Sequence, residues 1–270
     1  MTAAQRRWRL DLSYDGRGFH GFAAQPGTET VAGAIGDALA LALRLDEAPV
    51  LTCAGRTDAG VHALGQVLHV DLPEPLFAED RGPQGARLRR ALNGLLAGRV
   101  AILSASEADA RFDARFDATS RSYRYVLHES DTPSPLLDGL AWRVEPPLDL
   151  RAMAQAGYAL LGEHDFRAFC RRPAGTDAAT PILRRILDLS VAVADDSLSL
   201  AGTGRLVRLD VTAQAFCHQM VRSITATLVA VGQGRLSGAD VVAHLRAATR
   251  EGLPAPAPPE GLCLVQVAYG

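Results

Sequence analysis

The stretch RSYRYVLH, residues 121–128, decides the predicted fold because a repeated order of elements begins there. Tyr123 and Tyr125 share one face of this alternating run, which is typical of a half-buried β-strand. After this strand we expect a helix capped by Asp149, two long strands, two more helices and a last strand. The expected positions are strands near 121–128, 182–194, 205–215 and 262–269, and later helices that begin near Met220 and at Ser237.

The first half of the chain shows the same order. It begins with an alternating strand that ends at Tyr14, and Thr30 is the expected cap of the helix that follows. The expected positions are strands near 6–14, 50–54, 66–72 and 99–105, and helices over 31–45 and 87–96. Two tandem β-α-β-β-α-β units predict an α+β fold of two ferredoxin-like halves, each with its helices on one face.

We expect an N-terminal half over 1–110 and a C-terminal half over 111–270, with the boundary within 106–118. Near the end of the chain, the segment PAPAPPE (254–260) predicts a rigid, extended connection into the last strand.

The composition is that of a globular protein, with 48% hydrophobic and 21% charged residues in a chain of 270. No apolar run approaches the ~18 residues that a membrane span requires. The N-terminal sequence MTAAQRRWRL lacks the apolar core of a signal peptide. We therefore expect a cytoplasmic protein that does not associate with membranes.

The four cysteines lie far apart in the sequence and form no C-x-x-C pair. They are Cys53, Cys170, Cys217 and Cys263. This spacing predicts buried, unpaired thiols, and it argues against a zinc site or a disulfide framework.

All 28 basic residues are arginine, because the sequence contains no lysine. This excludes Schiff-base lysine chemistry and the P-loop lysine. Codon bias in a GC-rich genome also explains the missing lysine, and that alternative stays open. The arginines cluster near 87–90, 111–124, 167–172 and 184–185. Guanidinium groups suit bidentate contacts to phosphate, so local binding of RNA fits a chain whose net charge is only −2.

The segment GRGFHG (16–21) fits the pattern G-x-G-x-x-G of dinucleotide-binding proteins. In that motif a helix begins at the third glycine. Here Gln25-Pro26-Gly27 intervenes, and the helical pattern starts only near Thr30. We therefore expect a glycine-rich loop that approaches a backbone or a ligand, and no nicotinamide or flavin site. The hypothesis of a dinucleotide-dependent oxidoreductase would depend on this motif alone.

The loop CAGRTDAGVHALGQ (53–66) holds the strongest candidate for chemistry. Asp58 lies at its centre between glycines, with Arg56 two residues before it and His62 four residues after it. An Asx-turn that organises the loop is one interpretation. The other is a catalytic carboxylate on a rigid base, where a single acid suits a nucleophilic or proton-abstracting role.

Two further segments carry charge beside aromatic residues. In RFDARFDA (111–118), Asp113 and Asp117 are possible partners of Asp58, but their spacing beside Arg111 and Arg115 indicates a salt-linked turn. In the strand 121–128, we expect Tyr125 to pack in the core. Tyr123 beside Arg121 is typical of a surface that stacks an unpaired base.

Arg222 lies in FCHQMVRS (216–223), near the start of a predicted helix. We expect it to face solvent, unless the start of that helix lies against the Asp58 loop.

The loop GRTDAGVHALGQ (55–66) resembles the signature loop of the tRNA pseudouridine synthase A family. Six further matches follow the order of the family along nearly the whole chain, which identifies it as a member. They are YDGRGFHGF (14–22), ALN (91–93), FDARFDATSRSYRY (112–125), GEHDFRAF (162–169), FCHQMVRS (216–223) and PPEGLCLVQV (258–267).

The resemblance implies an isomerase that converts uridine to pseudouridine at positions 38 to 40 of the anticodon arm of tRNA. In this reaction the N-glycosidic bond breaks, the uracil turns, and its C5 is joined to C1′, without a metal, a nucleotide or any other cofactor. The resemblance also implies a homodimer, in which the two α+β halves form one pseudouridine-synthase-type sheet with a central cleft.

By match of motif, Asp58 looks like the essential carboxylate, which would add to the ribose or the base or remove a ribose proton. Tyr123 looks like the tyrosine that stacks on the target uracil. Arg222 is similar to the arginine that pairs with the aspartate and keeps it ionised. The implied substrate contacts are Arg56, which helps to hold the nucleotide out of the stack, Arg121, and an apolar wall from Leu262 or Leu264.

The chain departs from the family pattern at two positions. Phe22 stands where the family usually has tryptophan, and Ser223 stands where asparagine follows the arginine. Neither is a reacting group, so the departures concern contacts to the substrate. His62 belongs to the signature, and we expect it to fix the loop. A non-catalytic RNA-binding or RNA-folding factor is the alternative function, but a pure binder has no need of a carboxylate that faces phosphate.

Overall fold

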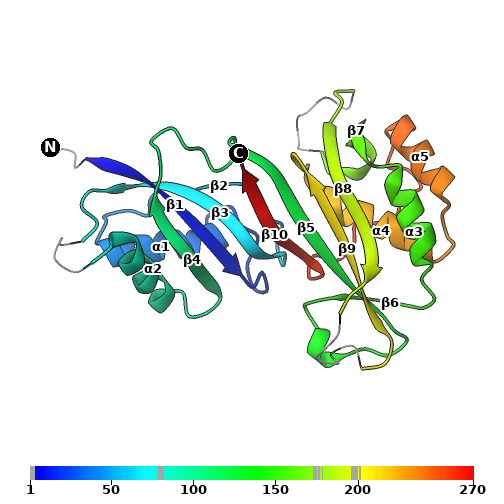
Figure 1. Cartoon of the computed structure of the whole chain (residues 1–270), viewed down its shortest axis with the longest axis horizontal. Coiled ribbons are helices and arrows are strands. Elements are labelled where there is room, and N and C mark those ends of the chain that lie inside the picture. Colours follow the sequence, from blue (N-terminus) through cyan, green and yellow to red (C-terminus); the bar gives the residue numbers. More distant parts are fainter. Residues whose placement is uncertain are drawn as a thin grey trace. The chain divides into compact units, whose positions relative to one another are not determined.

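The computed structural model of this chain describes residues 4–77, 82–172, 175, 177, 179–195, 200 and 202–270. The chain forms two compact units (Figure 1). Unit 1 comprises Met1–Thr119 and Leu264–Gly270, and unit 2 comprises Ser120–Cys263. Each unit combines strands with helices, which confirms the predicted α+β class.

The strands of unit 1 follow the order β4-β1-β3-β10, and the short β2 pairs with β3. The elements of this unit are β1 (Gln5–Tyr14), α1 (Val31–Leu43), β2 (Thr52–Cys53), β3 (His62–Pro73), α2 (Gln84–Leu95), β4 (Val100–Glu107) and most of β10 (Leu262–Tyr269). β1 is antiparallel to β3 and β4, and Leu10 lies opposite Leu68 in β3. Because alternate residues of a strand share a face, Leu10 and Leu12 are both fully buried.

Helix α1 begins where the sequence predicts it. The side chain of Thr30 accepts a hydrogen bond from the N–H of Gly33 at 3.1 Å, which caps the first turn. Ile35 and Leu39 lie one turn apart and are fully buried. The face that the periodicity predicts is therefore the face that packs into the core.

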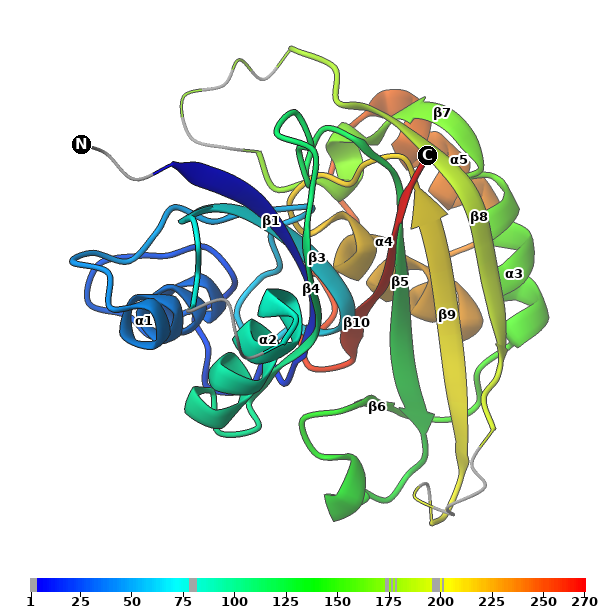
Figure 2. The ribbon, with the colours of Figure 1, turned by 60° about the vertical axis from the view of Figure 1, so that its left-hand side comes forward.

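The strands of unit 2 follow the order β5-β9-β8-β7, and β6 pairs in parallel with β5. The elements of this unit are most of β5 (Ala118–Glu129), η2 (Pro135–Leu137), β6 (Trp142–Val144), α3 (Leu150–Tyr158), β7 (Gly162–Asp165), η3 (Phe166–Phe169), β8 (Leu183–Val193), β9 (Arg205–Ala213), α4 (Met220–Gly232) and α5 (Gly238–Ala247). In Figure 2, α3, α4 and α5 lie on the same side of β5, β9 and β8. This arrangement agrees with the prediction of helices on one face.

Helix α4 is the central helix of unit 2, and its residues are buried along nearly its whole length. The helices around it have the predicted caps. Asp149 accepts the N–H of Ala152 at 2.9 Å at the start of α3, and Ser237 forms a capping box with Asp240 at the start of α5.

The predicted order of long elements is confirmed in both halves, and the differences are local. β2 has two residues, where the sequence predicts a strand over 50–54. β6 and β7 are not predicted from the sequence, because strands of three and four residues are too short to show an alternating pattern. Among the described residues, no helix is both long and apolar enough to cross a membrane.

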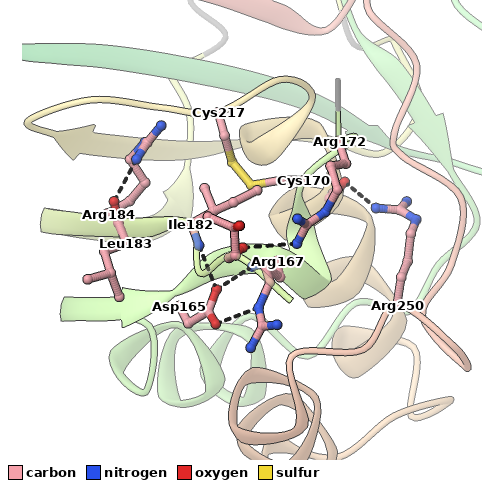
Figure 3. Close-up of a disulfide and its surroundings, with 11 residues drawn as sticks. Asp165, Arg167, Cys170, Arg172, Ile182, Leu183, Arg184, Cys217 and Arg250 are labelled. Carbon is pink, nitrogen blue, oxygen red and sulfur yellow. Dashed lines mark hydrogen bonds and ion pairs between the residues drawn. A yellow bond between two sulfur atoms is a disulfide. The ribbon is translucent and has the colours of Figure 1, made fainter. Parts of the chain in front are cut away.

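The prediction that all four cysteines are unpaired is wrong for two of them. Cys170 and Cys217 form a disulfide, with their Cα atoms 5.8 Å apart (Figure 3). η3 ends directly before Cys170, and Cys217 lies shortly before α4, so the fold joins residues that are 47 positions apart in the sequence. Cys53 is buried as expected, and burial raises the pKa of its thiol to about 11.

We expect an Ellman titration of the denatured, unreduced chain to detect two thiols, from Cys53 and Cys263, and four after reduction. Reduction should lower the free energy of unfolding by about 2–4 kcal/mol, because the open chain gains entropy in the unfolded state. A Cys170→Ser variant should show three thiols without reduction. Four reactive thiols in the unreduced wild type would contradict the pairing.

Candidate active site

Asp58 lies at a turn in the loop between β2 and β3. The N–H of Val61 donates to the Asp58 carbonyl at 3.2 Å, and Gly60 takes a φ of +79° within this turn. That conformation favours glycine over every other residue. Asp58 is half-buried, whereas Arg56 is exposed. The carboxylate is therefore attached to a tight bend whose backbone shape depends on Gly60.

The backbone on the N-terminal side of Asp58 is held at several points within unit 1. The buried hydroxyl groups of Tyr14 and Thr57 share a hydrogen bond of 2.7 Å. The carbonyl of Thr57 accepts the N–H of Phe22 at 3.1 Å. The side-chain amide of Gln66 donates to the carbonyl of Gly55 at 2.8 Å. These contacts fix the residues on which the position of Asp58 depends.

The glycine-rich segment 16–21 closely approaches a backbone, as predicted, and that backbone belongs to the same loop. A Cβ on Gly16 would lie 2.2 Å from the carbonyl oxygen of Val61, and one on Gly21 would lie 3.0 Å from that of Thr57. Helix α1 begins only at Val31, well after the third glycine of the motif. The glycines thus allow two backbone segments to approach each other closely. A dinucleotide fingerprint requires a helix that begins at its third glycine, and α1 does not begin there.

His62 connects this segment to the loop. The N–H of Gly16 donates to Nδ1 of His62 at 3.1 Å, and Asp15 lies 3.2 Å from the same nitrogen. The hydrogen bond from Arg17 lowers the pKa of the Asp15 carboxyl. These contacts support the predicted loop-fixing role of His62.

The segment RFDARFDA forms the predicted turn, and hydrogen bonds from backbone N–H groups hold it. Asp113 accepts the backbone N–H groups of Arg115 and Phe116, at 2.8 and 2.9 Å. Asp117 accepts the N–H of Asp113 at 2.8 Å. Arg111 pairs with Asp109, at 3.3 Å. A short acidic side chain readily accepts hydrogen bonds from nearby backbone N–H groups in an Asx-turn.

The same turn is docked on β3 by a buried histidine. Nδ1 of His69 accepts the N–H of Ala114 at 2.9 Å, and the Ala114 carbonyl accepts the hydroxyl of Tyr269 at 2.7 Å. Burial lowers the pKa of His69, which favours the neutral ring that this hydrogen bond requires.

Tyr123 and Tyr125 lie on the same face of β5 in unit 2. Tyr125 is fully buried, its hydroxyl donates to the carbonyl of Pro258 at 2.7 Å, and burial raises its pKa well above the usual range. This confirms its predicted core position. Tyr123 is 7% exposed and packs edge to face against Phe216, with ring centroids 5.1 Å apart. A T-shaped contact of this kind restricts the orientation of both rings.

The predicted arginines of unit 2 are held by backbone carbonyls. Arg121 is buried and donates to the carbonyl of Gln214 at 2.7 Å. Arg222, in the first turn of α4, is half-buried, and its Nε donates to the carbonyl of Ala257 at 2.7 Å. The simple expectation that Arg222 faces solvent is therefore wrong. The sequence of 254–260 predicts only a rigid connection and gives no signal for this contact.

The predicted site residues are divided between the units. Asp58, Arg56 and Leu264 belong to unit 1, and Tyr123, Arg121, Arg222 and Leu262 belong to unit 2. Leu262 and Leu264 are both buried, at 5% and 0% exposure. Among the described residues, no group of three or more histidine, cysteine or acidic side chains is arranged to hold a metal ion.

Comparison with known proteins gives consistent matches along the chain. A family described as tRNA pseudouridine synthase matches residues 156–270. A tRNA pseudouridine synthase A of Frankia casuarinae is 46% identical over 274 aligned residues, which cover 100% of this chain and 91% of the relative. Proteins of the same name from Rhodopseudomonas palustris and Cutibacterium acnes are 41% and 43% identical, and each alignment covers 97% of this chain. These alignments cover 98% and 88% of those relatives.

The buried pair of Tyr14 and Thr57 gives a prediction about the stability of the Asp58 loop. Tyr14→Phe leaves the Thr57 hydroxyl without its partner, so the free energy of unfolding should fall by about 1–3 kcal/mol. Replacing both partners, in Tyr14→Phe with Thr57→Val, should restore much of that loss, because no buried hydroxyl then remains unpaired. Urea unfolding of the four proteins of this cycle measures the coupling. If the loss of stability in the double variant equalled the sum of the losses in the two single variants, the predicted coupling between the two hydroxyl groups would be absent.

Proposed function

The chain belongs to the tRNA pseudouridine synthase A family, and on this premise we propose that it isomerises uridine to pseudouridine at positions 38–40 in the anticodon arm of tRNA. The family consists of isomerases that act on tRNA. The observation that carries the proposal is Asp58 itself, a half-buried carboxylate on a turn that neighbouring backbone and hydroxyl groups hold in place. A loop needed only for packing has little use for a carboxylate fixed in this way.

In the proposed mechanism, Asp58 supplies the carboxylate that starts the isomerisation. It adds to the ribose or the base, or it removes a ribose proton, and in each case the N-glycosidic bond breaks. The released uracil turns and forms the bond from its C5 to C1′. The bond from Asp58 to the ribose or the base breaks, or the abstracted proton returns to the ribose, and the free carboxylate is regenerated. The C5 proton leaves and a proton returns to N1, so the atoms of the product equal those of the substrate and no co-reactant is needed. The reaction therefore needs only the groups proposed for the site, which are a carboxylate, a phenol and guanidinium groups.

The remaining site residues have supporting roles in the proposal. Tyr123 stacks on the flipped uracil, which recovers part of the few kcal/mol that unstacking a base costs. Arg222 pairs with the carboxylate of Asp58 and keeps it ionised, as a nearby cation does. Arg56 and Arg121 contact the nucleotide and its phosphates, and the apolar wall comes from Leu262 or Leu264. The T-shaped contact with Phe216 supports the role of Tyr123, because it restricts rotation of the ring.

We expect the purified chain to form pseudouridine in unmodified tRNA transcripts with uridine at positions 38, 39 or 40. Asp58→Asn should reduce the rate by at least about 10²- to 10⁴-fold, because it removes the acid–base or nucleophilic group. Carbodiimide labelling followed by primer extension maps the product.

Asp37→Asn is the matched control, because Asp37 is an exposed aspartate on helix α1 of the same unit. It should keep the full rate. Full activity in Asp58→Asn would disprove the catalytic assignment. A wild type that binds tRNA but forms no pseudouridine would instead favour a non-catalytic RNA-binding factor.

We also propose that the protein acts as a homodimer, as the resemblance to the family implies. Light scattering coupled to size-exclusion chromatography should give twice the chain mass of 28.6 kDa at micromolar concentration. A mass of one chain at that concentration, together with full activity, would show that the monomer suffices.

A further inference from the structure

The segment from Arg250 to Gly261, which we call the strap, lies against the first turn of α4 within unit 2. The N–H of Ala257 donates to the carbonyl of Arg222 at 3.0 Å, and Nε of Arg222 donates back to the carbonyl of Ala257 at 2.7 Å. This reciprocal pair fixes both the backbone and the guanidinium plane of Arg222 relative to the strap. The direction in which Arg222 points therefore depends on where the strap lies.

The strap itself is stiff and is anchored at its C-terminal end. Four of its residues are proline, which restricts the backbone between Pro254 and Pro259. The hydroxyl of Tyr125 donates to the carbonyl of Pro258 at 2.7 Å, and Ala257 is only 1% exposed. Movement of this end is thus limited by the core of the unit.

Arg250 anchors the other end of the strap. It donates from Nη1 to the hydroxyl of Ser223 at 3.0 Å and from Nη2 to the carbonyl of Pro254 at 3.3 Å. Ser223 directly follows Arg222 and is 2% exposed. One guanidinium group therefore joins the helix turn that carries Arg222 to the strap that orients it. Figure 3 places Arg250 in the surroundings of the disulfide that precedes this turn.

Two features show that this contact is more than a surface hydrogen bond. No carboxylate pairs with Arg250 among the residues that the structure describes, and burial lowers its pKa. A partly buried cation that meets only neutral oxygens costs free energy, so its position requires a compensating gain. In addition, α4 has no side-chain cap, because its N-cap residue Gln219 adopts a φ of +63° and makes no capping hydrogen bond. The first turn of α4 therefore relies on other contacts.

We propose that Arg250 is a positioning residue for Arg222, through Ser223 and the strap. This inference rests on the proposed function, since it assumes that Arg222 acts beside the reacting groups. In this role Arg250 does not contact tRNA. Loss of Arg250 should leave binding of tRNA nearly unchanged and should slow the chemical step.

The first test compares Arg250→Met with wild type in single-turnover reactions on a tRNA transcript. The rate at saturating enzyme should fall about 10- to 100-fold, as expected when a misplaced group acts in the reaction. The Kd for the same transcript should change by less than about threefold, since the phosphate contacts remain. Arg250→Lys keeps one donor and should recover part of the rate. Arg246→Met is the control, because Arg246 is an exposed arginine on α5, and it should behave as wild type.

The second test asks whether Arg250 acts through Arg222. In an Arg222→Lys background, adding Arg250→Met should lower the remaining rate by less than about twofold, because coupled residues are not additive. Ser223→Ala removes the acceptor without touching Arg250, and it should reproduce part of the loss if Arg250→Met is too unstable to purify. An unchanged rate in Arg250→Met, a proportional loss of tRNA affinity, or fully multiplicative losses with Arg222→Lys would each overturn the proposal. None of these outcomes affects the Asp58→Asn result, so the two proposals can fail separately.

Discussion

A carboxylate can act on a bound nucleotide only if the loop that carries it keeps one shape, and here the hydrogen bond between Tyr14 and Thr57 is central to that constraint. Both hydroxyl groups are buried, so each would be costly to leave unpaired. Thr57 precedes Asp58, and its carbonyl also accepts the N–H of Phe22. The side chain of Thr57 is thus held by Tyr14, and its backbone is held by Phe22, which lies in a different segment of the chain. A loop held in this way loses its conformational entropy when the chain folds, so little more is lost when a substrate binds.

Unit 2 meets the same requirement by a different route. Arg222 lies in the first turn of a buried helix that has no side-chain cap, and its guanidinium is oriented by the Ala257 carbonyl. Tyr123 is held by a T-shaped ring contact with Phe216. In both units a hydrogen bond to a neutral group helps to fix the local geometry, from Tyr14 to Thr57 in unit 1 and from Arg222 to the carbonyl of Ala257 in unit 2.

The sequence predicts the fold well because the helices and long strands have strong periodic patterns and local caps. Thr30, Asp149 and Ser237 each mark the start of a helix, and each caps it as predicted. Asp58 stands out for a similar reason, since glycines and charge at the end of a strand are a local signal. The disulfide between Cys170 and Cys217 and the contact from Ala257 to Arg222 have no such signal. Both join residues more than 30 positions apart, and only the packed tertiary structure brings them together.

The two departures from the family motif differ in their physical meaning. Phe22 is 2% exposed and packs against Tyr14, so the missing tryptophan changes the packing beneath the Asp58 loop rather than a surface open to substrate. Ser223 is equally buried, but its hydroxyl is the acceptor for Arg250. A longer amide side chain at this position would need the strap and Arg250 to shift in order to fit. Serine at 223 and arginine at 250 therefore constrain each other, and a change at either position is expected to require a change at the other.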